Sequence, residues 1–309
     1  MRIAVVGAGG VGAAFGAALA KAGADVTFIA RGAHLAAMKA HGLKITGGRG
    51  ETHLVPTQAT DNPAGIGKVD FVLFCVKLWD VESAGQAIKP LLGPDTAVIT
   101  LQNGIDAHER LIPILGDRAV MPGVAHISAS ITAPGVITQV GDFMRMQFGE
   151  LDGRRSPRGE AFLAMCTKAG IEGTFSEAIL TPLWMKFILL ASNAGMMSLA
   201  RQPIGNLRDD PDMRPLFLAA YGEVADVGRA KGVALPEDAV AKTVALTGSM
   251  PAPMKASMAL DLERGNRLEV PWLSGKVVEL GKQYGIPTPT HAMMHAMLKP
   301  YAMGRASQA

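Results

Sequence analysis

The chain has 309 residues, of which 49% are hydrophobic and 18% are charged. This is enough apolar material for two packed domains and too much for a disordered chain. The formal net charge is only +3, without a long run of one sign, so we expect no nucleic-acid partner. Two distant cysteines, Cys75 and Cys166, exclude a disulfide scaffold and a CxxC motif. Because the first residues lack the apolar core of a secretory signal, we expect a cytoplasmic protein.

The first third of the chain alternates short apolar strands with helices, which favours a parallel sheet covered on both faces. Strands are predicted at 2–6, 25–30, 70–76 and 96–101, and helices at 11–22, 33–40, 81–92 and 106–115. Two more extended runs, 127–132 and 136–140, flank the turn signal Ala133-Pro134-Gly135 and predict an antiparallel extension of the sheet. The segment 152–158 carries Arg154, Arg155 and Arg158 and is predicted to be a solvated loop.

Strand signals fade after residue 176, and long apolar or amphipathic helices follow. They are predicted at 178–200, 213–231, 236–247, 253–265 and 270–284. We therefore predict an α/β domain with an antiparallel extension over residues 1–176 and an all-helical domain over 177–309. The segment 178–200 is interrupted by Thr181-Pro182 and Ser192-Asn193, so a buried core helix is favoured over a membrane span.

A glycine-rich motif follows the first strand and opens the first helix. Gly7-Ala8-Gly9-Gly10-Val11-Gly12 fits the pattern G-x-G-x-x-G in this context. Gly7 would permit the tight turn, Gly9 would let the backbone approach a pyrophosphate, and Gly12 would let the helix lie against the strand. The helix N-terminus would supply N–H groups to the phosphates. A glycine turn without a ligand is the alternative, but the context predicts a dinucleotide site in a Rossmann-type domain.

The end of the second strand indicates which dinucleotide is bound. NAD-selective sites usually carry a carboxylate there for the ribose 2′-hydroxyl, whereas this chain reads Phe28-Ile29-Ala30-Arg31. A guanidinium at Arg31 can pair with a 2′-phosphate. We therefore predict NADPH/NADP as the cofactor, with a solvated helix-start cation as the alternative for Arg31.

Lys186 is the sole charged residue between 178 and 200. Its stem could lie along the helix while its head reaches solvent. Its neighbours are apolar on both sides, however, and a lysine in a cleft with a lowered pKa could donate a proton. The residues alone leave both interpretations open.

Taken together, several short motifs in a fixed order resemble the ketopantoate reductase (2-dehydropantoate 2-reductase) family over nearly the whole chain. They are GAGGVG, Arg31, Val76-Lys77-Leu78-Trp79, Leu101-Gln102-Asn103-Gly104, Leu183-Trp184-Met185-Lys186, Pro203-Ile204-Gly205-Asn206-Leu207-Arg208, Ser257-Met258 with Asp261, and Leu268-Glu269-Val270.

The resemblance implies an NADPH-dependent reduction of ketopantoate to pantoate, a step of pantothenate synthesis, with the active site between the two domains. It implies that Lys186 is the general acid and that Glu269 lies beside it and the cofactor. Lys77 and Asn103 would contact the cofactor, and Asn103 and Ser257 would contact the substrate. The alternatives are an ordinary turn at Asn103 and surface positions for Ser257 and Glu269.

This chain departs from the family pattern where known members carry substrate-binding asparagines. The matching positions are Leu190, Ala194 and Ile204. Asn193 lies on nearly the same helical face as Lys186 and is predicted to take over one of those roles. The apolar replacements favour, as an alternative, a reductase for a more hydrophobic 2-oxo acid. A non-catalytic NADP-binding sensor is the alternative from another class.

We predict no metal site, because the seven histidines are scattered. His291 and His295 have a ligand-capable spacing but are interpreted as ordinary helix residues. A homodimer is expected only by analogy with the family.

Overall fold

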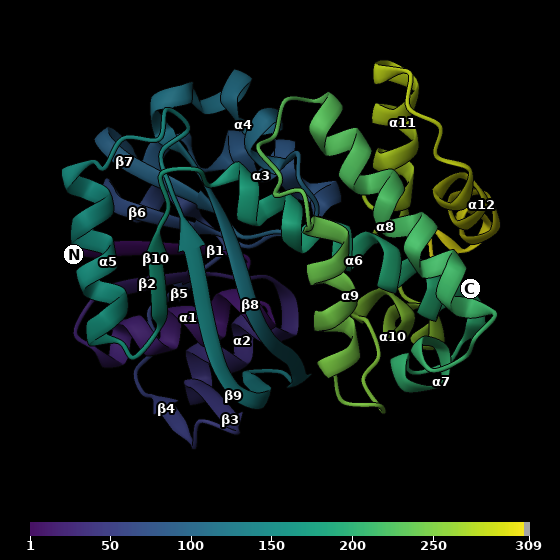
Figure 1. The fold of residues 1–309 in the computed structure, drawn as a ribbon. Coiled ribbons are helices and arrows are strands. Elements are labelled where there is room, and N and C mark those ends of the chain that lie inside the picture. Colours follow the sequence, from purple (N-terminus) through teal and green to yellow (C-terminus); the bar gives the residue numbers. More distant parts are fainter. Residues whose placement is uncertain (306–309) are drawn as a thin grey trace. The chain divides into compact units, whose positions relative to one another are not determined.

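The computed structural model describes residues 1–305 and divides into two compact units. Unit 1 comprises Met1–Gln102 and Asp106–Ile179, and unit 2 comprises Asn103–Ile105 and Leu180–Ala309. Unit 1 is built around a β-sheet, and unit 2 is helical (Figure 1). The short segment after the fourth predicted strand therefore packs with the helices that follow much later in the chain.

The sheet of unit 1 has ten strands within the described residues, in the order β4-β3-β9-β8-β7-β6-β1-β2-β5, with β10 paired to β9. The strands are β1 (Arg2–Val6), β2 (Asp25–Ile29), β3 (Leu43–Gly47), β4 (Thr52–Leu54), β5 (Ala59–Thr60), β6 (Val69–Phe74), β7 (Leu92–Thr100), β8 (Val120–Ala133), β9 (Val136–Phe148) and β10 (Glu172–Phe175). From β5 to β8 all neighbours are parallel, and β8 pairs with β9 antiparallel. The predicted parallel sheet with an antiparallel extension is confirmed.

The central strands form because their apolar runs are buried on both faces, as parallel sheets require. Four of the five β1 residues and five of the six β6 residues are buried. The predicted start of β8 at residue 127 was too late, because the strand begins at Val120 and includes Pro122 and Gly123. Both residue types weaken a strand signal. Pro122 lies opposite Thr100, at the last residue pair between β7 and β8.

The helices of unit 1 are α1 (Gly10–Lys21), α2 (Gly32–His41), α3 (Val81–Ala87), α4 (Ala107–Leu115) and α5 (Pro157–Lys168). The prediction that 152–158 is a solvated loop was wrong at its end. Arg158 lies in α5, and its side chain is 14% exposed and 2.7 Å from the Glu150 carboxylate. Ser156 accepts a hydrogen bond from Gly159 N–H and so caps the helix, and Pro157 is its first residue. A serine followed by a proline is a sequence signal for the start of a helix.

Unit 2 is all-helical, as predicted. Its helices are α6 (Leu180–Ala200), α7 (Ile204–Arg208), α8 (Met213–Ala230), α9 (Ala239–Ser249), α10 (Ser257–Arg264), α11 (Ser274–Tyr284) and α12 (Pro289–Leu298). Helix α6 packs against α8, α9, α10 and α12. It is long and apolar enough to cross a membrane, but 67% of its most apolar window is buried within the protein, the pattern of a core helix.

Helix α1 can lie against β8 only because residue 10 has no side chain. A Cβ at Gly10 would lie 2.0 Å from the carbonyl oxygen of Ala129 in β8. Gly10→Ala must therefore push α1 away from the sheet, and we expect the free energy of unfolding to fall by about 1–3 kcal/mol in urea denaturation. Gly222→Ala in α8 is the control, because a Cβ there meets nothing within 4 Å. An equal urea midpoint for Gly10→Ala and wild type would contradict this account.

Candidate active site and cofactor-binding turn

The turn after β1 has the geometry predicted from its glycines. Gly7 has φ +90°, and a Cβ there would lie 2.9 Å from the backbone of Cys75. The N–H groups of Gly7 and Ala8 both donate to the Ile29 carbonyl at 3.2 Å, which ties the turn to the end of β2. A Cβ at Gly12 would lie 2.4 Å from the Gly7 carbonyl. Glycine is therefore required at both ends of the motif.

The beginning of α1 is open to a ligand. Gly9 is the N-cap residue, and no side chain caps the helix. A Cβ at Gly9 would meet nothing within 4 Å, so the space beside it is not filled by protein. With Gly10 and Val11 in the first turn, the backbone N–H groups and the positive end of the helix dipole are available to an anion. These residues fit the pyrophosphate of a dinucleotide.

Arg31 and Lys77 follow the strands on either side of β1. Arg31 is the exposed N-cap of α2, directly after β2. Lys77 is exposed after β6, with its Nζ 5.7 Å from the ring centroid of Trp79. Because β2, β1 and β6 are parallel neighbours, both cations lie at the same edge of the sheet as the glycine turn. This is the edge at which open α/β sheets bind ligands.

Unit 2 brings Lys186, Asn103 and Glu269 together. The Lys186 ammonium donates to Asn103 Oδ1 at 3.3 Å, and Asn103 Nδ2 donates to Glu269 Oε2 at 3.4 Å. Both neighbours fix the orientation of the amide, because an ammonium can only donate and a carboxylate can only accept. Gly104, with φ +87°, permits the turn that carries Asn103. Residues far apart in the sequence thus form one polar row.

The packing of α6 determines the position of Lys186. Trp184 is 1% exposed and lies against α8, where a Cβ at Gly228 would be 2.7 Å from the indole ring. Phe187 packs edge-on against Trp184, with ring centroids 5.8 Å apart. With those two rings on the core side, Met185 and Lys186 fall on the partly exposed side of the helix.

Burial and a nearby carboxylate have opposite effects on the charge of Lys186. Burial lowers its pKa to about 8, and the nearby negative charge of Glu269 opposes this shift. Glu269 itself is only 4% exposed and immediately precedes a short 3-10 helix, Val270–Trp272. The ammonium form therefore predominates near neutral pH, but its proton is held far less tightly than that of an exposed lysine.

Asn193 is engaged inside the helical unit. Its side chain accepts from the Tyr221 hydroxyl at 2.5 Å and donates to Thr247 Oγ1 at 3.4 Å, and the two hydroxyls are 2.8 Å apart. Burial raises the pKa of Tyr221 to about 12, so the phenol remains a donor. The amide and the two hydroxyls can therefore form a closed ring of hydrogen bonds, and the substrate role of Asn193 stays a prediction.

The remaining residues assigned from the sequence are more scattered. Ser257 is the exposed first residue of α10. Ala194 and Ile204 are buried, at 1% and 0% exposure. Tyr221 and Thr247 were not identified from the sequence, because no motif links them to Asn193. Only the packing of α6, α8 and α9 against one another brings the three together.

Comparison with known proteins identifies the family. Residues 3–153 match the profile of ketopantoate reductase PanE/ApbA, and residues 178–302 match the profile of its C-terminal part. The chain is 30% identical to a 2-dehydropantoate 2-reductase of Mesorhizobium japonicum, over 99% of each chain. The chain belongs to the ketopantoate reductase family. It is therefore an oxidoreductase of the NAD(P)-dependent type.

Solved structures of ketopantoate reductases have the same fold. A PanE/ApbA family ketopantoate reductase from Ralstonia eutropha superposes with a TM-score of 0.89 at 30% identity, covering 98% of both chains. A D-mandelate dehydrogenase bound to NADH and anilino(oxo)acetate has the same TM-score at 20% identity, covering 98% of both chains. At that identity the second likeness shows the fold alone.

The contribution of Glu269 to Lys186 can be measured directly. In Glu269→Gln the charge that favours the ammonium is removed, so we expect the pKa of Lys186 to fall below 8. NMR titration of the labelled lysine side chain reports this value. Glu279→Gln, at an exposed acid of α11 paired with Lys276, is the control and should leave the titration unchanged. A Lys186 pKa that stays the same in Glu269→Gln would disprove the coupling.

Proposed function

We propose that the protein is an NADPH-dependent 2-dehydropantoate 2-reductase that forms pantoate for pantothenate synthesis in the cytoplasm. The observation that carries the proposal is the Lys186 ammonium, held by Asn103 and balanced by Glu269, with a pKa of about 8. The full-length similarity to 2-dehydropantoate 2-reductases supports it.

The glycine turn would hold the pyrophosphate, with Arg31 on the 2′-phosphate and Lys77 as a further cofactor contact. When bound, NADPH supplies the hydride. Lys186 would hydrogen-bond the ketone oxygen and give it a proton, so that one hydride and one proton convert the carbonyl to a hydroxyl. Asn103 would orient the ammonium, Glu269 would keep it charged between turnovers, and Ser257 would hydrogen-bond the substrate.

A more hydrophobic 2-oxo acid is the second candidate substrate. Leu190, Ala194 and Ile204 offer no hydrogen bonds where family members carry asparagines. Both polar atoms of the Asn193 amide also have partners within the helices. Hydride transfer and protonation do not depend on these positions, whereas substrate choice does.

The role of Lys186 is tested by Lys186→Ala. We expect kcat to fall roughly 100- to 10,000-fold, because general acid catalysis contributes that much, while the Kd for NADPH stays the same. In wild type, kcat should fall as pH rises through about 8, since the ammonium then loses its proton. Undiminished NADPH oxidation in Lys186→Ala would eliminate this mechanism.

The same assay, run on wild type with ketopantoate and with bulkier aliphatic 2-oxo acids, identifies the substrate. The highest kcat/KM with ketopantoate supports the proposal, and a far higher value with a bulkier acid selects the second candidate. NADPH binding without turnover of any 2-oxo acid would indicate a sensor instead.

The preference for NADPH is tested by Arg31→Ala. Loss of the guanidinium should raise the KM for NADPH about tenfold or more, because the free energy of a charge-assisted hydrogen bond corresponds to a factor of about ten or more in affinity. The KM for NADH should not change, because NADH has no 2′-phosphate. Lys39→Ala, at an exposed cation of the same helix, is the control. An unchanged KM for NADPH would show that Arg31 does not select the cofactor.

A further inference from the structure

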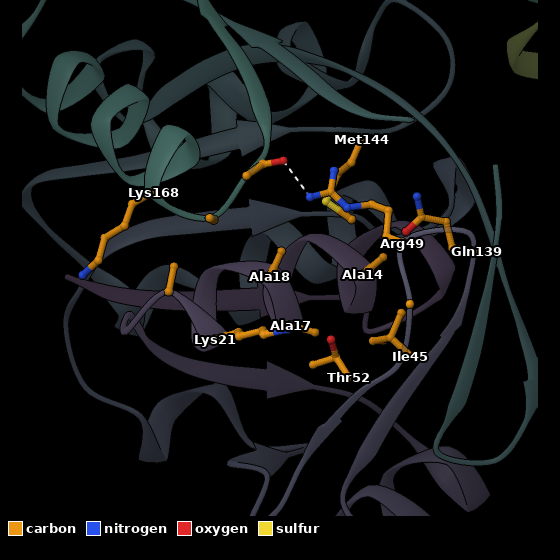
Figure 2. Close-up of a pocket in the computed structure, with 14 residues that line it drawn as sticks. Ala14, Ala17, Ala18, Lys21, Ile45, Arg49, Thr52, Gln139, Met144 and Lys168 are labelled. Atoms are coloured by element: carbon orange, nitrogen blue, oxygen red, sulfur yellow. Dashed lines mark hydrogen bonds between the residues drawn. The ribbon is translucent and has the colours of Figure 1, made fainter. Parts of the chain in front are cut away.

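Unit 1 contains a cavity that the proposed reaction does not use. It has a volume of about 360 Å³ and extends along α1 from Ala14 to the end of the helix (Figure 2). Its floor is apolar and consists in part of Ala14, Ala17, Ile45 and Met144, all at most 7% exposed. The volume lies within the range of small-molecule sites in proteins, which are typically about 300–1,000 Å³.

Three cations from different elements line this cavity. Lys21 lies in the last turn of α1, Arg49 in the connection between β3 and β4, and Lys168 in the last turn of α5. None of the three has an ion-pair partner within residues 1–305, and no lining residue is acidic. Glu51, next to the lining residues Gly50 and Thr52, is paired with Lys44. The wall of the cavity is therefore positively charged.

One of the cations is held in place by the fold. The Arg49 guanidinium donates to the Gly170 carbonyl at 2.8 Å, the contact drawn as a dashed line in Figure 2. This bond uses one Nη2 hydrogen, and the guanidinium has four further N–H groups. A planar guanidinium fixed in this way is suited to binding a carboxylate or a phosphate.

The two helix ends explain only part of this charge. Lysines are favoured near helix C-termini, each of which is equivalent to about half a negative charge. Both ends are also capped by backbone N–H groups, since Ala22 donates to Ala18 and Ala169 donates to Met165. Two half-charges leave about two of the three positive charges unbalanced. All three side chains are exposed, so this charge is available to a bound anion.

We propose that this cavity is a second ligand site, which binds a small organic anion. The carboxylate or phosphate of the ligand would pair with the fixed guanidinium of Arg49, and a short apolar chain would lie over the alanine face of α1. Lys21 and Lys168 would add to the positive charge around the cavity. The site is distinct from the cofactor turn, because Lys21 and the start of α1 at Gly10 are separated by eleven residues, roughly 16 Å of helix.

Calorimetry with the full-length protein tests the site, with hexyl phosphate and hexanoate as probes. We expect binding of one or both. Inorganic phosphate and 1-hexanol should bind about tenfold more weakly, because the first lacks the apolar chain and the second lacks the anionic group. The two anionic probes distinguish a phosphate ligand from a carboxylate ligand. Absence of heat from both would overturn the proposal.

Two variants distinguish specific binding in the cavity from a general attraction of the anionic probe to a basic surface. Arg49→Gln removes the fixed guanidinium, and Ala18→Leu fills the cavity without changing any charge. Each should raise the probe Kd about tenfold or more, whereas Lys89→Gln, at a cation that does not line the cavity, should have no effect. Equal Kd values in Ala18→Leu and wild type would disprove the site.

Saturating NADPH distinguishes this site from the cofactor turn. We expect the probe Kd to be the same with and without NADPH, since the cavity begins at Ala14 and its α1 cation, Lys21, lies at the C-terminal end of the helix. Displacement of the probe by NADPH would show that it binds in the cofactor site, and the proposal of a second site would then fail.

Discussion

The reaction that we propose for this protein depends on keeping one ammonium group charged on an apolar helix. Burial works against the charge on Lys186, and Glu269 works for it, so that the pKa settles at about 8. Neither effect alone would give a useful acid, because an exposed lysine holds its proton too tightly and an isolated buried lysine would lose it. Asn103 links the two charges and has only one amide orientation that satisfies both. The proton donor that we propose therefore consists of Lys186 together with Asn103 and Glu269.

A second constraint, close backbone approach, determines the glycine turn after β1. Gly7 and Gly12 are required because a side chain would collide with neighbouring backbone, whereas Gly9 is bordered by open space. Different glycines of one motif thus serve different purposes, and only the open one faces a region that a pyrophosphate could occupy. The same close packing lets α1 lie across β8 at Gly10.

In the proposed reaction, the residues of the helical unit that would donate the proton differ from those that would select the substrate. Lys186 lies beside Asn103, which in turn contacts Glu269, whereas the positions that would bind the substrate are other residues. In this chain those positions are apolar, and the amide of Asn193 is used by Tyr221 and Thr247. A buried ring of hydrogen bonds fixes how α6, α8 and α9 pack, because breaking it would leave polar groups unsatisfied.

Local sequence patterns determined the order of the main elements, because short apolar strands, glycine turns and long apolar helices follow from backbone and burial preferences. They also determined the glycine turn and the family, through motifs in a fixed order. They missed α5, whose sequence begins among arginines, and could not show that Arg158 is buried against Glu150. Only the tertiary structure decided that Asn103 packs with helices 80 and more residues later and that Tyr221 engages Asn193. Such contacts depend on how elements pack, and no local pattern records the distance between side chains that lie far apart along the chain.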